Sequence, residues 1–252
     1  MRGYTGMRTK PERGTVRGAV KRRLSETSKH ATNGGRRTFL ARAAAGGAGL
    51  ALAMAGLREA LAADAVRKKG VAQIRGDVRV NGEPAKPGMA LRPGDSVITG
   101  NDALLVAVVG RDAYLLRADT QLELEAGRKK GIPGVLRIVT GAVLAVFVPG
   151  ESKQVRTESA SIGIRGTAVY VEKEASRTYV CTCYGTARLR PVDDPKAAQT
   201  VRTKHHDQPR YIYPKGAPRM IEKAPVVNHT DAELVMLESL VGRKVPFTPG
   251  RY

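Results

Sequence analysis

Short turn-forming motifs recur along this chain beyond residue 70. Between them lie apolar runs rich in valine, isoleucine and leucine; the turns are Asn81-Gly82, Pro87-Gly88, Pro93-Gly94-Asp95, Gly110-Arg111-Asp112 and Pro149-Gly150. A spacing of about 8 to 12 residues between turn signals leaves room for strands rather than for ordinary helices. The sequence therefore predicts an all-β fold, a sandwich or roll of short antiparallel strands.

Alternation inside the runs indicates antiparallel sheet. Leu122 and Leu124 alternate with polar residues between Gln121 and Glu125, which is the pattern of a half-buried strand. A polar connection at 191–196 separates a principal β-domain over residues 70–190 from a C-terminal extension over 191–252. The expected strands cover 71–80, 96–99, 103–109, 113–117, 121–125, two runs within 135–148 broken at Thr140-Gly141, 155–159, 168–172, 178–183, 186–190 and one or two more within 201–213.

One helix is expected, near the end of the sequence. Thr230 followed by Glu233 forms a capping box, and Asp231 is placed favourably in the first turn. Apolar residues then follow at i, i+3 and i+7, and a glycine stops the pattern: Leu234, Leu237, Val241 and Gly242. A helix over 231–241 is predicted to pack this apolar stripe against the β-domain.

The N-terminal part carries the pattern of a twin-arginine export signal over residues 36–62. Its apolar stretch spans about 15 residues, whereas a membrane helix needs about 20. We therefore expect a periplasmic protein without a stable membrane anchor, a mature chain that begins near Ala63, and a basic, unstructured extension over 1–35. The basic region is Arg36-Arg37 with Phe39 and Leu40 behind it. The apolar stretch is 43–57, and the A-x-A cleavage site is formed by Ala60 and Ala62.

The formal charge of +20 is divided evenly between the signal part and the mature part. Residues 1–62 hold 13 Lys/Arg against 3 Asp/Glu, which leaves 30 against 20 for the mature part, so each has a net charge of +10. A mature domain this basic, with a run such as Arg128-Lys129-Lys130, favours an envelope protein or an anionic envelope polymer as partner. No aromatic interleaving, recognition helix or zinc-finger spacing accompanies these charges, so nucleic acid is not expected.

Several motifs together resemble the FecR domain, a family named after the periplasmic ferric-citrate signalling regulator. The most specific piece is Gly163-Ile164-Arg165-Gly166-Thr167 with Val169 and Val171; the others are Gly76-Asp77-Val78, Val80, Asn81-Gly82, Leu91, Gly94-Asp95, Thr99-Gly100, Gly110, Thr157 and Ala160. The resemblance covers about residues 70–190 and implies an extracytoplasmic β-rich domain without catalytic residues. The family's regulators also carry a sigma-factor-binding segment and a membrane helix, in whose place this chain has a cleavable-looking signal.

The glycine and arginine core of this motif has a structural interpretation. Gly163 and Gly166 are expected where the backbone needs a positive φ or a close approach, and Thr167 begins the next strand. Arg165 is expected to pair with a carboxylate such as Asp95 and to tie two turns together; the alternative is that it binds an anionic ligand.

Two cysteines and three histidines of the mature part raise the question of a metal. Cys181 and Cys183 lie in an expected strand, with their side chains on the same face, and they are interpreted as core residues, a disulfide, or a metal or redox pair. Neighbouring histidines on a strand point to opposite faces, so His205 and Asp207 are the pair that could share an ion there, whereas a loop lifts this restriction. His229 joins such a cluster only if the C-terminal part folds back.

No catalytic motif accompanies these groups: there is no nucleophile elbow, metalloprotease helix, phosphate loop or dinucleotide fingerprint. The sequence therefore predicts a non-enzymatic, exported module that binds a ligand or partner, or signals, in the cell envelope, without a cofactor. The alternative is a periplasmic metal- or haem-binding protein that uses Cys181, Cys183, His205, Asp207 and His229.

The double substitution Arg36→Lys and Arg37→Lys tests the export signal. Because the twin-arginine route reads the two guanidinium groups, the variant should leave the uncleaved precursor in the cytoplasm. Fractionation and immunoblotting measure this directly, and periplasmic accumulation equal to that of the unaltered chain would contradict the assignment.

Overall fold

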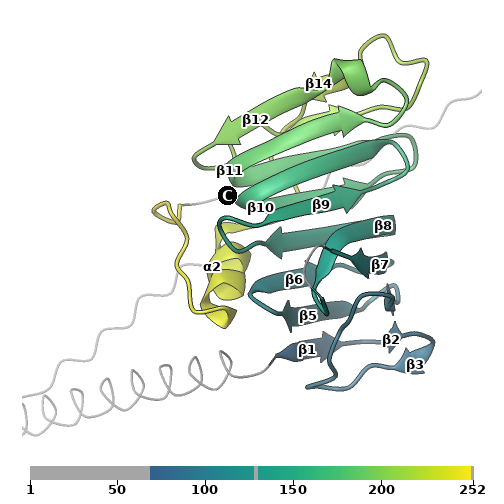
Figure 1. Cartoon of the computed structure of the whole chain (residues 1–252), viewed down its shortest axis with the longest axis vertical. Helices are drawn as coiled ribbons and strands as arrows, with labels where there is room; N and C mark the ends of the chain where they lie inside the picture. Colours follow the sequence, from purple (N-terminus) through teal and green to yellow (C-terminus); the bar gives the residue numbers. More distant parts are fainter. Residues whose placement is uncertain (1–68, 128–129, 251–252) are drawn as a thin grey trace, which may run out of the picture. The chain divides into compact units, whose positions relative to one another are not determined.

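The computed structural model describes residues 69–127 and 130–250, which belong to one compact unit, Leu52–Tyr252. The predicted export signal lies outside the described residues. Within them the chain forms fourteen strands, one 3-10 helix (η1, Pro195–Ala197) and one α-helix (α2, Asp231–Leu240) near the C-terminal end (Figure 1). The predicted all-β class with a single C-terminal helix is confirmed.

The strands pair into one continuous sheet. Its path runs β14-β13-β11-β10-β9-β8-β7-β4-β2-β3, β12 pairs with β11, and β6 joins β8 to β5 and β1. The pairing of β8 with β9 is parallel and the others are antiparallel. The strands are β1 (Gly70–Arg75), β2 (Val78–Val80), β3 (Glu83–Pro84), β4 (Ser96–Thr99), β5 (Leu104–Val109), β6 (Asp112–Leu116), β7 (Gln121–Ala126), β8 (Pro133–Val146), β9 (Ser152–Arg156), β10 (Ala160–Lys173), β11 (Thr178–Pro191), β12 (Gln199–Thr203), β13 (Arg210–Ile212) and β14 (Ile221–Lys223).

The C-terminal extension belongs to the same sheet as the domain before it. β12 and β13 both pair with β11, and β14 pairs with β13. In the described part of the chain, no helix is long and apolar enough to cross a membrane.

Three strands are longer than the sequence predicted: β8, β10 and β11 each have 14 residues. The expected break at Thr140-Gly141 is wrong, because β8 continues through it. Gly141 has a φ of 74° and lies beside an irregularity in the pairing of β7 with β8. Such a bulge bends a strand and inserts one residue without ending it.

The bulge also reverses which residues of β8 face inward. Leu136 and Ile138, before Gly141, lie in the larger of two buried clusters, and Val143 and Ala145, after it, lie in the same cluster. Strict alternation would have kept even-numbered residues on that side throughout the strand. Gly166 (φ 55°) and Gly185 (φ 92°) accompany the same reversal in β10 and β11, where the inward residues are Ile162, Ile164, Val169 and Val171, and Val180, Ala187 and Leu189.

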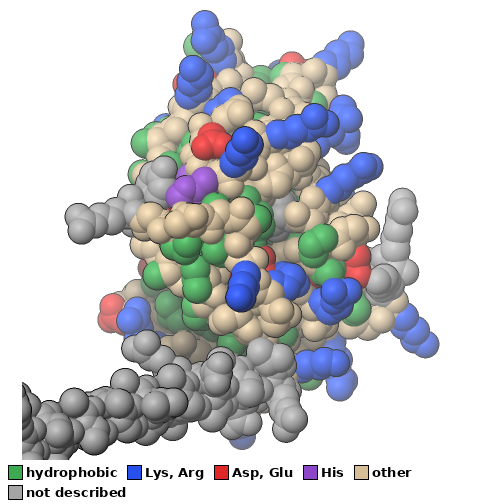
Figure 2. Space-filling model, turned by 90° about the vertical axis from the view of Figure 1, so that its left-hand side faces the viewer, with side chains coloured by type: hydrophobic (Ala, Val, Ile, Leu, Met, Phe, Trp, Pro, Cys, Tyr) green, Lys and Arg blue, Asp and Glu red, His purple; other side chains and the backbone are tan. Residues whose placement is uncertain are grey.

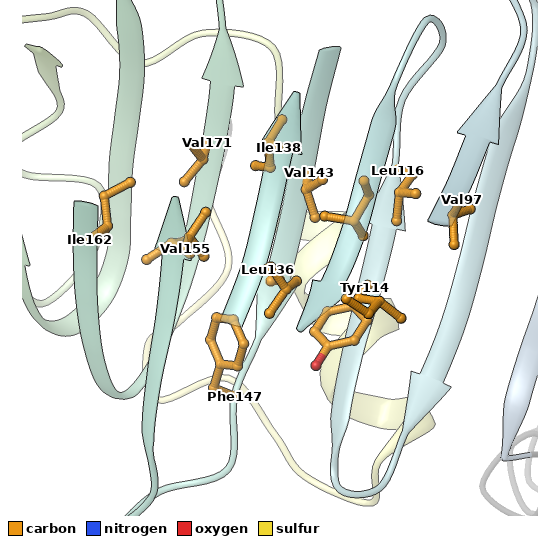
Figure 3. Close-up of a cluster of buried hydrophobic side chains, with 14 of the residues drawn as sticks. Val97, Tyr114, Leu116, Leu136, Ile138, Val143, Phe147, Val155, Ile162 and Val171 are labelled. Carbon is orange, nitrogen blue, oxygen red and sulfur yellow. The ribbon is translucent and has the colours of Figure 1, made fainter. Parts of the chain in front are cut away.

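The larger cluster, called the inner core here, fills the space enclosed by the folded sheet. Figure 3 shows side chains from several neighbouring strands, among them Leu116, Leu136 and Val171, gathered in this cluster. Tyr114 and Phe147 are its largest members, with ring centroids 6.0 Å apart. Burial of aliphatic surface on this scale is the main stabilising contribution to such a fold.

The second cluster, called the outer core, lies on the opposite face of the central strands. It contains the side chains that alternate away from the inner core, such as Leu115, Leu144 and Tyr170. Residues 224–250, called the C-terminal segment here, cover it: α2 lies against β6 and β8 and contributes Leu234 and Leu237 (Figure 1). The predicted capping box at Thr230 and Glu233 is confirmed, and α2 ends one residue earlier than predicted.

The glycine at position 141 offers a test of this architecture. A Cβ atom there would lie 2.4 Å from Thr120 Oγ1 and 2.5 Å from Thr120 Cα, and the positive φ adds strain. Gly141→Ala should therefore lower the free energy of unfolding by about 2–5 kcal/mol in urea titrations.

Gly82→Ala is the matched control. Gly82 also has a positive φ, 86°, but no atom lies within 4 Å of a Cβ built there. This variant should lose only the conformational part, about 1–2 kcal/mol. Equal losses in the two variants would contradict the packing role of Gly141.

Candidate metal centre

β11 directs both cysteines into the outer core. Cys181 and Cys183 are two residues apart on the strand, so their side chains share the face that the C-terminal segment covers. Both side chains are fully buried and both are free thiols, so the disulfide interpretation does not describe this structure. The two sulfur atoms form one side of a cluster.

The bend after β12 brings the first histidine to this cluster. His206 has a φ of 52°, and its backbone N–H donates to the carbonyl oxygen of Cys183 at 2.9 Å. The segment at 204–206 is therefore not a strand, and the expected separation of neighbouring histidines onto opposite faces does not apply. His206 is buried, and its Nδ1 atom lies 3.4 Å from Cys181 Sγ.

The residue before the N-cap of α2 brings the second histidine. His229 is buried, its ring stacks on Tyr170 at a centroid distance of 4.7 Å, and its Nε2 atom lies 3.0 Å from His206 Nδ1. The C-terminal part does fold back, which is the condition under which His229 was expected to join the cluster. Three separate segments therefore meet at this point: β11, the bend after β12, and the start of the C-terminal segment.

The four donor atoms lie close enough together to surround one ion. One donor atom from each of Cys181, Cys183, His206 and His229 lies within 4.8 Å of all the others. With Zn–S bonds of about 2.3 Å and Zn–N bonds of about 2.0–2.1 Å, the edges of a tetrahedron measure about 3.3–3.8 Å. The separations of 3.4 Å and 3.0 Å around His206 are close to such edges.

The hydrogen bonds of the two imidazoles direct their electron pairs to the same place. The carbonyl oxygen of Val227 accepts from His229 Nδ1 at 2.7 Å, which leaves Nε2 of a neutral His229 with a lone pair. The Asp231 carboxylate accepts from His206 Nε2 at 3.2 Å, which leaves Nδ1 of a neutral His206 with a lone pair. Two lone pairs 3.0 Å apart repel each other unless a proton or a cation lies between them.

Asp231 supports the cluster from outside. Its Oδ1 atom accepts from both His206 Nε2 and His205 Nε2, and its Oδ2 atom accepts from the backbone N–H of Gly250. A carboxylate behind a ligating histidine fixes the ring orientation and makes the nitrogen a stronger ligand. Burial opposes ionisation of Asp231, yet its bonds with His205, Gly250 and His206 hold its pKa below the usual value.

The surroundings also separate the two thiols. Burial raises the pKa of Cys183 well above its usual value, and Cys181 adds to this rise. A hydrogen bond with Cys183 lowers the pKa of Cys181, and contacts with His206 and His229 lower it further, against the effect of burial. Burial disfavours protonated His206, but the bonds with Cys181 and Asp231 outweigh it and raise that pKa.

The five residues named from the sequence as candidate ligands do not all meet. Cys181, Cys183 and His229 belong to the four-residue cluster, whereas His205 contacts Asp231 and stacks on Phe247 at 4.1 Å. The Asp207 carboxylate accepts from the backbone N–H of Lys204 and His205 and lies outside the cluster. On the face shown in Figure 2, histidine atoms reach the surface in one small area, beside hydrophobic side chains.

Sequence reasoning missed His206 as a ligand. It treated 201–213 mainly as strand, in which His205 and His206 diverge, and the positive φ of His206 has no glycine or asparagine to signal it. Asp231 was recognised only as a helix N-terminal residue. Its role behind His206 requires knowledge of how the C-terminal segment folds back.

The family-motif residues lie elsewhere in the sheet. Gly94 and Asp95 form the turn before β4, where the Asp95 carboxylate accepts from Asn81 Nδ2 and Arg92 N. Gly166 has a positive φ, and a Cβ there would lie 2.6 Å from Pro149 Cα. Thr167 belongs to β10.

Arg165 and Gly163 differ from their expected roles. Among the described residues, no ion pair joins Arg165 to Asp95, because the Asp95 carboxylate is occupied by its own turn and Arg165 lies on the exposed face of β10. Gly163 lacks a positive φ, and a Cβ there would meet nothing closer than 3.9 Å.

No protein-family model and no curated protein matches this chain. Among the solved structures that resemble it are two crystal structures of a putative anti-sigma factor from Parabacteroides distasonis. Each is 12% identical to this chain with a TM-score of 0.42; one match covers 56% of this chain and 71% of the other, and the second covers 62% and 84%. Similarity this weak establishes neither a shared function nor a shared partner.

Proposed function

We propose that this chain is a non-enzymatic module of the cell envelope whose β-domain holds one zinc-type ion. The observation that carries the proposal is the convergence of two thiols and two imidazoles, all buried, on one point between the sheet and the C-terminal segment. Two sulfur and two nitrogen donors in tetrahedral arrangement are the usual set for structural zinc.

The charge of the site favours a divalent over a monovalent ion. Two thiolates and two neutral imidazoles carry a charge of −2, so a Zn²⁺ ion makes the centre neutral, whereas Cu⁺ leaves a net negative charge. Cys181 and Cys183 are fully buried, and an uncompensated charge at such a depth costs several kcal/mol. The adjacent Asp231 carboxylate increases this preference. Donor chemistry alone would not decide between the two ions, because thiolates bind both Zn²⁺ and Cu⁺.

The geometry supports a structural rather than a catalytic metal. Catalytic zinc keeps one coordination position for water or substrate, and here protein side chains supply all four donors. A haem is not proposed, because a macrocycle needs a flat slot far wider than the space among donors that lie within 4.8 Å of one another.

The proposed role of the ion follows from the three segments of the chain that it would connect. Cys181 and Cys183 belong to the sheet, His206 to the bend after β12, and His229 to the C-terminal segment. The ion therefore fastens the cover of the outer core to the sheet, and the binding or signalling surface is that of the metal-loaded fold. The FecR-like motifs and the export pattern over residues 36–62 support a periplasmic place for this activity.

The proposed export route suits such a centre. Thiols meet oxidising conditions in the periplasm and reducing conditions in the cytoplasm. An ion bound before export would protect both thiols from those oxidising conditions.

Metal analysis of the natively exported protein tests the proposal. We expect one zinc per chain, and we expect Co²⁺ in its place to produce the visible absorption bands of a tetrahedral thiolate site. Cys183→Ser and His206→Ala should each weaken Zn²⁺ binding by about 100-fold or more, because both a bond and the geometry are lost. Competition titration with a chromophoric chelator measures the affinity.

Asp207→Asn is the matched control, since Asp207 is next to His206 but outside the cluster. Its affinity for Zn²⁺ should equal that of the unaltered protein. Protein that contains no metal, has no tetrahedral Co²⁺ spectrum and has the same thermal stability with and without chelator would overturn the metal centre. The cluster would then be a buried thiolate–imidazolium pair.

Asp231→Asn tests the support behind the site. The amide keeps the size of the side chain but removes the charge that orients His206, so Zn²⁺ affinity should fall by about 10- to 100-fold while the tetrahedral Co²⁺ spectrum is retained. Unchanged affinity would contradict this role of Asp231.

A further inference from the structure

A hollow lined by arginines lies on the exposed face of β9, β10, β11 and β12, which are neighbours in the sheet and lie side by side in the upper part of Figure 1. It has a volume of about 390 Å³, and its lining contains Arg165, Arg188 and Arg202 together with serine and threonine residues. No carboxylate belongs to this lining.

The strand register explains why the three guanidinium groups surround one point. Residues directly opposite each other in antiparallel pairs share a face. Arg165 of β10 is opposite Thr186 of β11, and Thr186 is opposite Arg202 of β12, so these three form one row across the sheet. In the next row Arg188 is opposite Gly163 of β10.

Gly163 forms the floor of the hollow. Its backbone does not have a positive φ, and the nearest atoms to a Cβ built there are Arg188 O at 3.9 Å and Arg188 Cβ at 4.0 Å. Neither conformation nor packing therefore requires glycine at this position. What glycine does is leave open the space between the arginines.

The charges of the hollow are available to a ligand. Arg165, Arg188 and Arg202 are exposed, and among the described residues none of them forms an ion pair. Lys153 also lines the hollow, but it is buried and its Nζ atom lies 2.8 Å from Asp112 Oδ2, so its charge is already compensated. Three unpaired guanidinium groups around an open floor form a ready site for oxyanions.

We propose that this arginine hollow binds a flexible linear polymer of phosphate groups. Guanidinium forks match phosphate oxygens in pairs, and the neighbouring serine and threonine hydroxyls can donate to the remaining oxygens. The site extends beyond one phosphate, because Arg190 is exposed on the same face two residues further along β11. The proposal does not depend on the metal centre.

The lining argues against other partners. Core positions of protein interfaces are enriched in aromatic residues, and single-stranded nucleic acid is held by aromatic stacking, yet the hollow contains no aromatic side chain. The recess at Gly163 suits a narrow chain better than a flat lipid surface. An anionic chain without bases or apolar groups fits these features.

Binding of linear polyphosphate to the purified, metal-loaded protein tests the proposal by isothermal titration calorimetry. We expect Arg188→Ala with Arg202→Ala to weaken binding by about 10- to 100-fold, because two charge-assisted contacts are lost. Gly163→Val should weaken it at least about tenfold by filling the floor while all the arginines remain, since one lost contact of about 1.4 kcal/mol is tenfold. Circular dichroism and urea titration check that each variant is folded.

Arg75→Ala with Arg92→Ala is the matched control, because it removes the same charge from exposed arginines in β1 and in the turn before β4. Its affinity should stay within about twofold of the unaltered protein, as general electrostatics alone contributes little at moderate salt.

Three results would overturn the proposal. The first is the absence of polyphosphate binding, and the second is an equal loss of affinity in the control and in the hollow variants. The third is tighter binding of polyglutamate, duplex DNA or phosphatidylglycerol vesicles than of polyphosphate. Loss of zinc binding with polyphosphate binding intact would leave this inference standing and remove only the metal centre.

Discussion

The glycine bulges in β8, β10 and β11 are the constraint on which the rest of the structure depends. Each long strand buries side chains on both faces, and each reverses its alternation near one glycine with positive φ. Without the reversal, half of each strand would place its polar residues in the inner core, since side chains alternate with a period of two. The bulges let one sheet bend around the inner core while its central strands present a second apolar face, and that face needs a cover.

The cover explains where the soft donors lie. The C-terminal segment buries the outer core with Leu234 and Leu237, but it also closes over two thiols and two imidazoles. Within the cluster His206 contacts both Cys181 and His229, so polar contacts already join the cover to the sheet. The divalent ion that we propose would add a cross-link there, because binding free energy released at a site that exists only in the folded state is folding free energy.

Turn chemistry allowed the all-β class, most strand positions and α2 to be predicted, because Asn-Gly and Pro-Gly pairs and the Thr230–Glu233 capping box act locally. The full length of β8, and the fact that 178–183 and 186–190 form one strand, could not be predicted. In a sequence, a glycine that ends a strand looks the same as a glycine that forms a bulge within it. The candidate site was half predictable for a related reason. Cys181 and Cys183 share a face by strand geometry alone, whereas His206 turns inward through a positive φ that no residue type announces.

β11 shows how a single bulge lets one strand carry two unlike sites. Up to Cys183 the outward-facing residues are odd-numbered and place Cys181 and Cys183 under the C-terminal segment, and Tyr184, next to Gly185, joins the same outer core. After Gly185 the outward-facing residues are even-numbered and place Arg188 and Arg190 in solvent, while Ala187 and Leu189 enter the inner core. Had the alternation continued unchanged, the two arginines would lie in the inner core, where an unpaired charge costs several kcal/mol. The conformation of Gly185 therefore determines both that the thiols are covered and that the arginines are free to meet an anion.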